Sequence, residues 1–124
     1  MSFLKKLFKR GEEDDDDSPI LLDASVYSPK LLRLEKALDA VANEMRQDAT
    51  LDNPGWRGRV NEYSQLAGEA MQVRRGSSIS REAVLDIVFA VRPVFSGAIP
   101  EGLEKLGPLQ EEMMAAAEDL RKPT

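Results

Sequence analysis

The chain contains no cysteine and no histidine. Without cysteine it can form no disulfide bond, thiolate nucleophile or Cys-based zinc site, and this usage is compatible with a reducing cytoplasm. Without histidine, catalysis would have to rely on Asp, Glu, Lys, Ser or Tyr, and the sequence shows no recognisable catalytic constellation of these residues. It also has no phosphate loop, dinucleotide fingerprint or EF-hand spacing. We therefore predict a protein that is not an enzyme, with no cofactor and no metal.

Long apolar runs are also missing. No run approaches the ~18 residues of a membrane-spanning helix, and the N-terminus has lysines where a secretory signal would have its apolar region. The net charge of −5 disfavours a nucleic-acid partner, because such binding depends on neutralising phosphates. These absences predict a cytoplasmic protein.

Helical periodicity dominates the remaining sequence. Apolar residues recur at spacings of three and four, which places them on one face of a helix. Ser28–Pro29 and Asn53–Pro54 are typical helix starts, Ser80 can cap a third helix, and Gly76 can end the second. The expected helices span approximately residues 29–48, 54–75, 81–92 and 100–122.

The expected fold class is all-α, with about four helices in a compact antiparallel bundle on residues 28–124. Because Gly107–Pro108 interrupts the last segment, we expect the last helix to be kinked. Low aromatic content, 6% of residues, favours aliphatic helix packing.

Two parts of the predicted bundle are candidate partner surfaces. Residues 83–91 are apolar nearly all round, so their helix is either the most buried one or has a face, including Phe89, that meets a partner. A strand is a weaker alternative for this stretch. Met113 and Met114 are adjacent, so both can hardly face the same core, and an exposed methionine suits an adaptable binding surface. A second copy of the chain is one conceivable partner.

Residues 1–10 form a separate unit with two distinct faces. At about 100° per residue on a helix, the apolar residues gather on one side and the cations on the other. The apolar side has Phe3, Leu4, Leu7 and Phe8, and the cationic side has Lys5, Lys6, Lys9 and Arg10. This segregation is typical of a helix that lies in the surface of an anionic membrane. The alternatives are a groove of a partner protein and a terminus with no ordered role.

Residues 11–27 connect this peptide to the bundle. They begin with Gly11 and six consecutive carboxylates, residues 12–17, which repel one another and predict a disordered linker. The run is a solvated spacer or folds back on the cations of residues 1–10; a divalent-metal site is disfavoured because a flexible run lacks fixed geometry. Ile20, Leu21 and Leu22 could cover one end of the core or form a short extended segment.

The stretch FLKKLFKRG, residues 3–11, resembles the short membrane-targeting helix at the C-terminal end of the MinD family of bacterial division-site ATPases. The likeness covers nine residues, lies at the opposite terminus and brings no ATPase signature. It implies peripheral binding to the inner membrane face and implies nothing about the bundle.

The sequence therefore predicts an adaptor or regulatory subunit. Its bundle would bind a protein partner, and residues 1–10 would attach the assembly reversibly to the membrane surface. The alternative is a soluble interaction module whose N-terminal peptide docks into a groove of a partner protein. A protein that mimics nucleic acid is disfavoured, because the lysines and arginines interspersed among the acidic residues of 18–124 prevent a uniformly negative surface.

Overall fold

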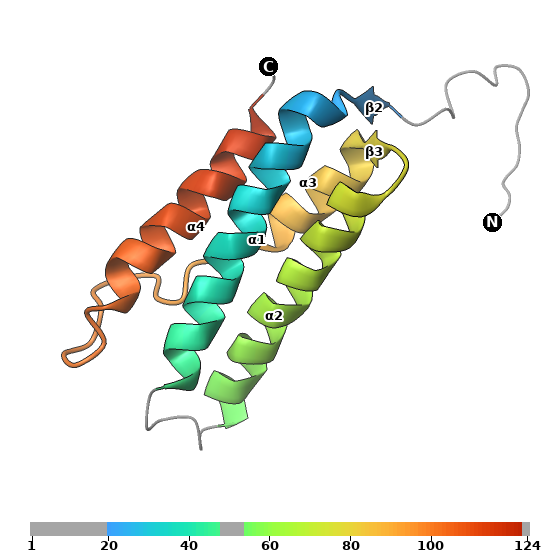
Figure 1. Cartoon of the computed structure of the whole chain (residues 1–124). Helices are drawn as coiled ribbons and strands as arrows, with labels where there is room; N and C mark the ends of the chain where they lie inside the picture. The colour runs from blue at the N-terminus through green and yellow to red at the C-terminus, as the bar shows by residue number, and fades with distance from the viewer. Residues whose placement is uncertain (1–19, 48–53, 123–124) are drawn as a thin grey trace, which may run out of the picture.

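The computed structural model describes residues 20–47 and 54–122, which form four helices and a small sheet (Figure 1). In chain order the elements are β2 (Leu21–Leu22), α1 (Ala24–Arg46), α2 (Pro54–Arg75), β3 (Ile79–Ser80), α3 (Arg81–Ala90) and α4 (Leu106–Arg121). Successive helices run in opposite directions, so the predicted all-α class and helical bundle are confirmed. The predicted amphipathic helix of residues 1–10 and the acidic linker lie outside the described residues, apart from the end of the linker.

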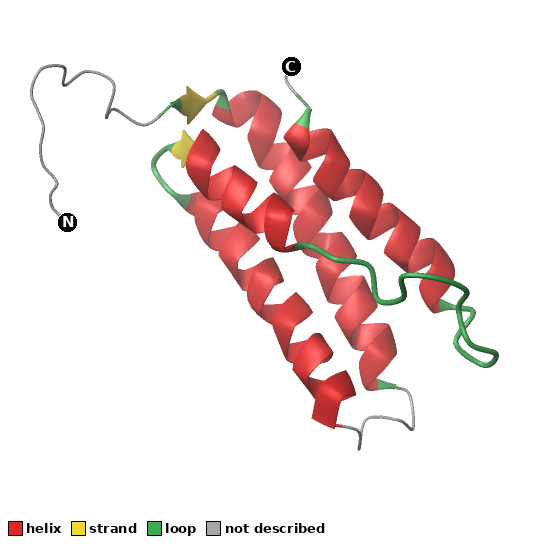
Figure 2. Cartoon of the chain, turned by 180° about the vertical axis from the view of Figure 1, so that it is seen from behind, coloured by secondary structure: helices red, strands yellow, loops and turns green. Residues whose placement is uncertain are grey.

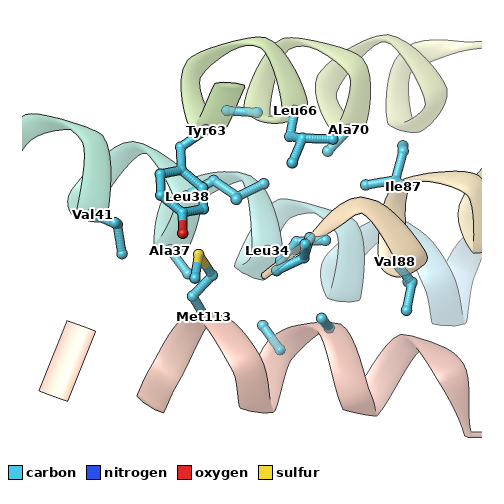
Figure 3. Packing of buried hydrophobic residues seen from close by; sticks show 14 of the residues in the cluster. Leu34, Ala37, Leu38, Val41, Tyr63, Leu66, Ala70, Ile87, Val88 and Met113 are labelled. Carbon is cyan, nitrogen blue, oxygen red and sulfur yellow. The ribbon is translucent and has the colours of Figure 1, made fainter. Parts of the chain in front are cut away.

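Helix α1 is the centre of the packing. Its apolar residues at three- and four-residue spacing form a continuous stripe, and α2 and α4 both pack along it (Figure 3). The buried residues of α1 are Tyr27, Leu31, Leu34, Ala37, Leu38, Val41, Ala42 and Met45. No charged residue in the described part of the chain is buried in this core. The bundle is therefore held by one aliphatic interior shared by all four helices.

Helix α1 begins earlier than the Ser28–Pro29 signal predicts. The helix starts at Ala24, where the Asp23 carboxylate accepts a hydrogen bond from the Ser25 backbone N–H at 2.9 Å and caps the first turn. Pro29 therefore lies inside the helix. The cap and the burial of Tyr27 on the same face as Leu31 outweigh the hydrogen bond that a proline removes.

The segment just before α1 is extended. Leu21 and Leu22 of β2 pair antiparallel with Ser80 and Ile79 of β3, and the Arg81 N–H donates to the Ile20 carbonyl at 2.8 Å. A two-stranded ribbon is marginal in isolation. Here it is supported by Ile79, which is buried in the core. The segment is therefore extended, as one of the two alternatives predicts, and Leu22 also packs against the core.

The boundaries of α2 and α3 agree with the sequence signals. Helix α2 begins at Pro54 and ends at Arg75, directly before Gly76. The Ser80 hydroxyl caps α3 by accepting from the Ala83 N–H at 3.1 Å. Helix α3 ends at Ala90, three residues before Pro93. The strand alternative for residues 83–91 is wrong, because Val84, Ile87 and Val88 form the buried side of a helix.

The predicted kink in the last helix is wrong. Residues 91–105 contain turns and no helix, and α4 begins at Leu106 (Figure 2). Pro108 is then the third residue of α4, where a backbone N–H has no partner within the helix, so the proline costs no hydrogen bond. Gly102 occupies a turn with φ of 94°, a conformation that favours glycine.

Residues 91–105 cross the bundle where a longer α3 would have continued (Figure 2). The buried Tyr63 hydroxyl donates to the Arg92 carbonyl at 2.6 Å, and Arg59 donates to the Pro93 carbonyl at 2.6 Å. Arg59 also donates to the Tyr63 hydroxyl at 3.1 Å. Desolvation by burial raises the pKa of Tyr63. These bonds fasten the start of the loop to α2.

Ion pairs fix the position of α1 against both neighbours. Arg33 makes a two-pronged contact with Glu112 of α4, at 2.7 and 3.0 Å, and Arg74 of α2 pairs with Glu35 at 2.9 Å. The hydrogen bonds from Arg33 lower the pKa of Glu112. The Arg33–Glu112 pair is exposed, and such a pair adds at most about 1 kcal/mol, whereas the Arg74–Glu35 pair is half-buried. Both pairs help to fix the register of the helices.

We expect Leu34→Ala to lower the free energy of unfolding by about 2–5 kcal/mol, because it leaves a cavity in the centre of α1. Leu32→Ala is the matched control, since Leu32 lies on the same helix but is only half-buried. Urea unfolding followed by circular dichroism measures both. Equal losses would contradict the assigned orientation of α1.

We expect Tyr63→Phe to lower the free energy of unfolding by about 1–3 kcal/mol, because it leaves the Arg92 carbonyl without its buried donor. Hydrogen exchange should also accelerate more for the amides in residues 91–95 than for those in α1. A variant as stable as the parent, with unchanged exchange, would show that the loop is held by apolar contacts alone.

Candidate functional site

The binding residues predicted at the N-terminus lie outside the described part of the chain. They are Phe3, Leu4, Lys5, Lys6, Leu7, Phe8, Lys9 and Arg10. Their role in membrane or partner binding stays a prediction.

The three candidate partner residues of the bundle have different environments. Phe89 is 68% exposed on α3, more than any other large apolar residue in the described part. Met113 is 0% exposed and points into the core toward Ala37 (Figure 3), so its placement on a partner surface is corrected. Met114 is half-buried and packs against the core. Adjacent helix positions point about 100° apart, which explains why only one methionine is fully buried.

A pocket of about 330 Å³ lies at the end of the bundle where β2 enters. Residues from the sheet end, the start of α1, the first turns of α3 and the last turn of α4 surround it. The lining residues are Leu21, Leu22, Asp23, Tyr27, Arg81, Val84, Leu85, Leu120, Arg121 and Lys122. We call this the strand-end pocket.

The strand-end pocket combines buried apolar side chains with exposed cations. Tyr27, Val84 and Leu120 are buried, whereas Arg81, Arg121 and Lys122 are exposed. We call these three cations the cationic rim. Such a pocket suits a ligand that presents an anionic group beside an apolar one.

The carboxylates near the rim already have hydrogen-bond partners. Asp23 accepts from both the backbone N–H and the hydroxyl of Ser25, and these bonds lower its pKa. Glu118 forms a salt bridge with Arg121 at 2.7 Å, and the Arg121 hydrogen bonds lower the pKa of Glu118. Within residues 20–47 and 54–122, Arg81 and Lys122 form no salt bridge.

Exposed apolar residues gather near the same end. Ile20 and Leu21 are 59% and 58% exposed, and Val26, in the first turn of α1, is also exposed. Sequence reasoning left Ile20 to Leu22 undecided between a core cap and an extended segment. It missed the pocket, because the lining comes from three separate parts of the chain, residues 21–27, 81–85 and 120–122, which carry no motif.

A smaller pocket of about 200 Å³ lies at the opposite end of the bundle. It is lined by Arg46, Arg57, Val60 and Asn61. Here Arg46 already donates to Asn43 at 2.6 Å and to the Ser64 hydroxyl. The pocket has one apolar lining residue, Val60, so it is a weaker candidate for a ligand of mixed character.

The described ranges, residues 20–47 and 54–122, offer neither a metal site nor a membrane-spanning helix. No three acidic side chains there are grouped so that they could hold a metal ion. None of the four helices combines the length and apolar content that crossing a bilayer requires. Comparisons of the chain with protein-family models, curated proteins and solved structures found no match.

We expect Phe89→Ser to change the free energy of unfolding by no more than about 0.5 kcal/mol, because the ring is exposed and the two residues have similar helix propensity. Val88→Ser, one position earlier and buried, is the control and should cost about 1–3 kcal/mol. Thermal unfolding measures both. A large loss at Phe89 would assign this ring to the core and remove it from the candidate surface.

Proposed function

We propose that this chain is a non-enzymatic adaptor or regulatory protein whose bundle binds a protein partner. Residues 1–10 tether it reversibly to an anionic membrane surface at the inner face of the cell membrane. The observation that carries the tether is the complete separation of apolar and cationic residues in those ten positions.

The energetics favour weak and reversible attachment. Burial of two phenylalanines and two leucines contributes roughly 6–12 kcal/mol before costs. Each cation near an anionic leaflet adds about 1 kcal/mol. Ordering the backbone costs about 1–2 kcal/mol per residue, so the opposing terms are of similar size. A second copy or a membrane-bound partner would strengthen the attachment.

The packing of the bundle supports a separate role for the terminal peptide. Residues 20–47 and 54–122 already cover the apolar stripe of α1 with their own side chains. The apolar side chains of residues 1–10 are therefore not needed to complete that interior. This independence favours a peptide that acts on another surface.

The partner surface proposed for the bundle consists of Phe89 and the neighbouring Leu85 on α3, beside the cationic rim. Leu85, which lines the pocket, lies one helical turn before Phe89, so the two share a side of α3. Exposed aromatic and apolar side chains beside cations are typical of the anchors of protein interfaces.

The alternative function is a soluble interaction module whose N-terminal peptide docks into a groove of a partner protein. A fusion of residues 1–11 to a fluorescent protein separates the two functions in cells. The membrane tether predicts peripheral fluorescence that strengthens with tandem copies. If the fluorescence co-localises with a protein partner and leaves the periphery when that partner is removed, the result favours docking of the peptide into a groove of that partner.

We expect Phe3→Glu combined with Phe8→Glu to abolish sedimentation with anionic vesicles, because the apolar face then contains two charges. Arg57→Glu changes the net charge equally at an exposed site on the bundle and serves as the matched control. The control should retain binding. A doubly substituted chain that binds as well as the parent would end the proposal of a membrane tether.

A further inference from the structure

The acidic run, residues 12–17, precedes Ile20 in the chain by a few residues, and Ile20 lies beside Arg81 of the cationic rim. The Arg81 N–H donates to the carbonyl of Ile20, so the backbone of Ile20 lies against the residue that opens α3. Asp17 is three residues before Ile20. A chain extends at most ~3.6 Å per residue, so Asp17 lies within roughly 11 Å of Ile20 and Glu12 within roughly 29 Å.

The described residues give the rim three cations and place two ionised carboxylates, Asp23 and Glu118, beside them. Arg81 and Lys122 form no salt bridge within the described residues, and Asp23 is engaged as the cap of α1. Arg121 forms an exposed pair with Glu118 within the last turn of α4, and Lys122 also attracts this carboxylate without forming a salt bridge. The run has six carboxylates and the rim has three cations, so their charges are complementary.

We infer that the cationic rim of the strand-end pocket binds the acidic run, residues 12–17, of the same chain. The short connection makes the contact intramolecular and gives the run a high effective concentration at the rim. Individual exposed ion pairs are weak, so the contact depends on several charges acting together and weakens with salt. The inference goes beyond the membrane tether and does not depend on it.

Two other occupants fit the rim less well. Residues 1–10 contain four cations and no acid, so the rim repels them. An acidic segment of a second copy or of a partner would have to displace a run that is already attached beside the rim. Held there, the six carboxylates are also kept from the cations of residues 1–10, which stay available for an anionic surface.

The absence of cysteine allows a clean test in the full chain. A Gly11→Cys variant places one nitroxide label directly before the run, and paramagnetic broadening of backbone amides reports its position by NMR. The comparison chain also has Asp14 to Asp17 replaced by Asn. We call the Gly11→Cys chain with the native run the acidic chain. We expect the amides of Arg81, Leu85 and Lys122 to be broadened more in the acidic chain than in the comparison chain, and we call this difference the excess broadening. The excess broadening should disappear at 1 M salt, where the Debye length is about 3 Å.

Substitutions in the rim provide the second measurement. Arg81→Gln with Lys122→Gln should remove the excess broadening, whereas Arg57→Gln with Lys105→Gln, an equal charge change at exposed positions toward the opposite end, should leave it. Equal broadening in the acidic and Asn chains would overturn the inference, because it would reflect the tether alone. A mixture of isotope-labelled chain without nitroxide and nitroxide-labelled chain of natural isotope abundance detects contacts between copies. Broadening in that mixture would also overturn the inference, because it would identify a second copy as the occupant.

Discussion

Burial of the apolar stripe of α1 is the constraint on which the rest of the structure depends. The stripe runs from Tyr27 to Met45, and α2 and α4 cover it from two sides. These two helices take most of that surface, and the ten-residue α3 packs against α2 and α4 on the remaining side of the bundle. The last part of that side is covered by residues 91–105, which are held by backbone hydrogen bonds to side chains of α2. The polar contacts of the fold therefore complete an arrangement that apolar burial determines.

The two ends of the bundle differ as a result of this arrangement. At one end the short sheet brings the incoming chain beside the starts of α1 and α3 and the last turn of α4. Three cations and several exposed apolar residues gather there, and they come from separate parts of the chain. The six carboxylates that precede Ile20 then have two sets of cations within reach, one on the bundle and one in residues 1–10. If the proposals for the tether and for the acidic run both hold, competition between these two sets of cations would link the bundle to its tether.

Local signals predicted much of the fold and little of the site. Pro54 and Ser80 mark helix starts correctly because capping and proline geometry act within one turn. The start of α1 was misplaced because Asp23 also caps well, and burial of Tyr27 extends the helix past a proline. The sequence predicts that the last helix begins near residue 100, whereas α4 begins at Leu106. Apolar spacing alone cannot distinguish a helix from a loop that buries a few side chains. The pocket depends on tertiary contacts between distant residues, and no local pattern encodes it.

Native-state hydrogen exchange on the full chain tests most directly whether α1 organises the bundle. Amides of α1 between Leu31 and Met45 should exchange slowest, with an opening free energy equal to that of global unfolding. Amides of α3 and of residues 91–105 should exchange through smaller, local openings. If α3 were protected to the global limit while the centre of α1 opened more readily, α1 would not be the element that holds the bundle together.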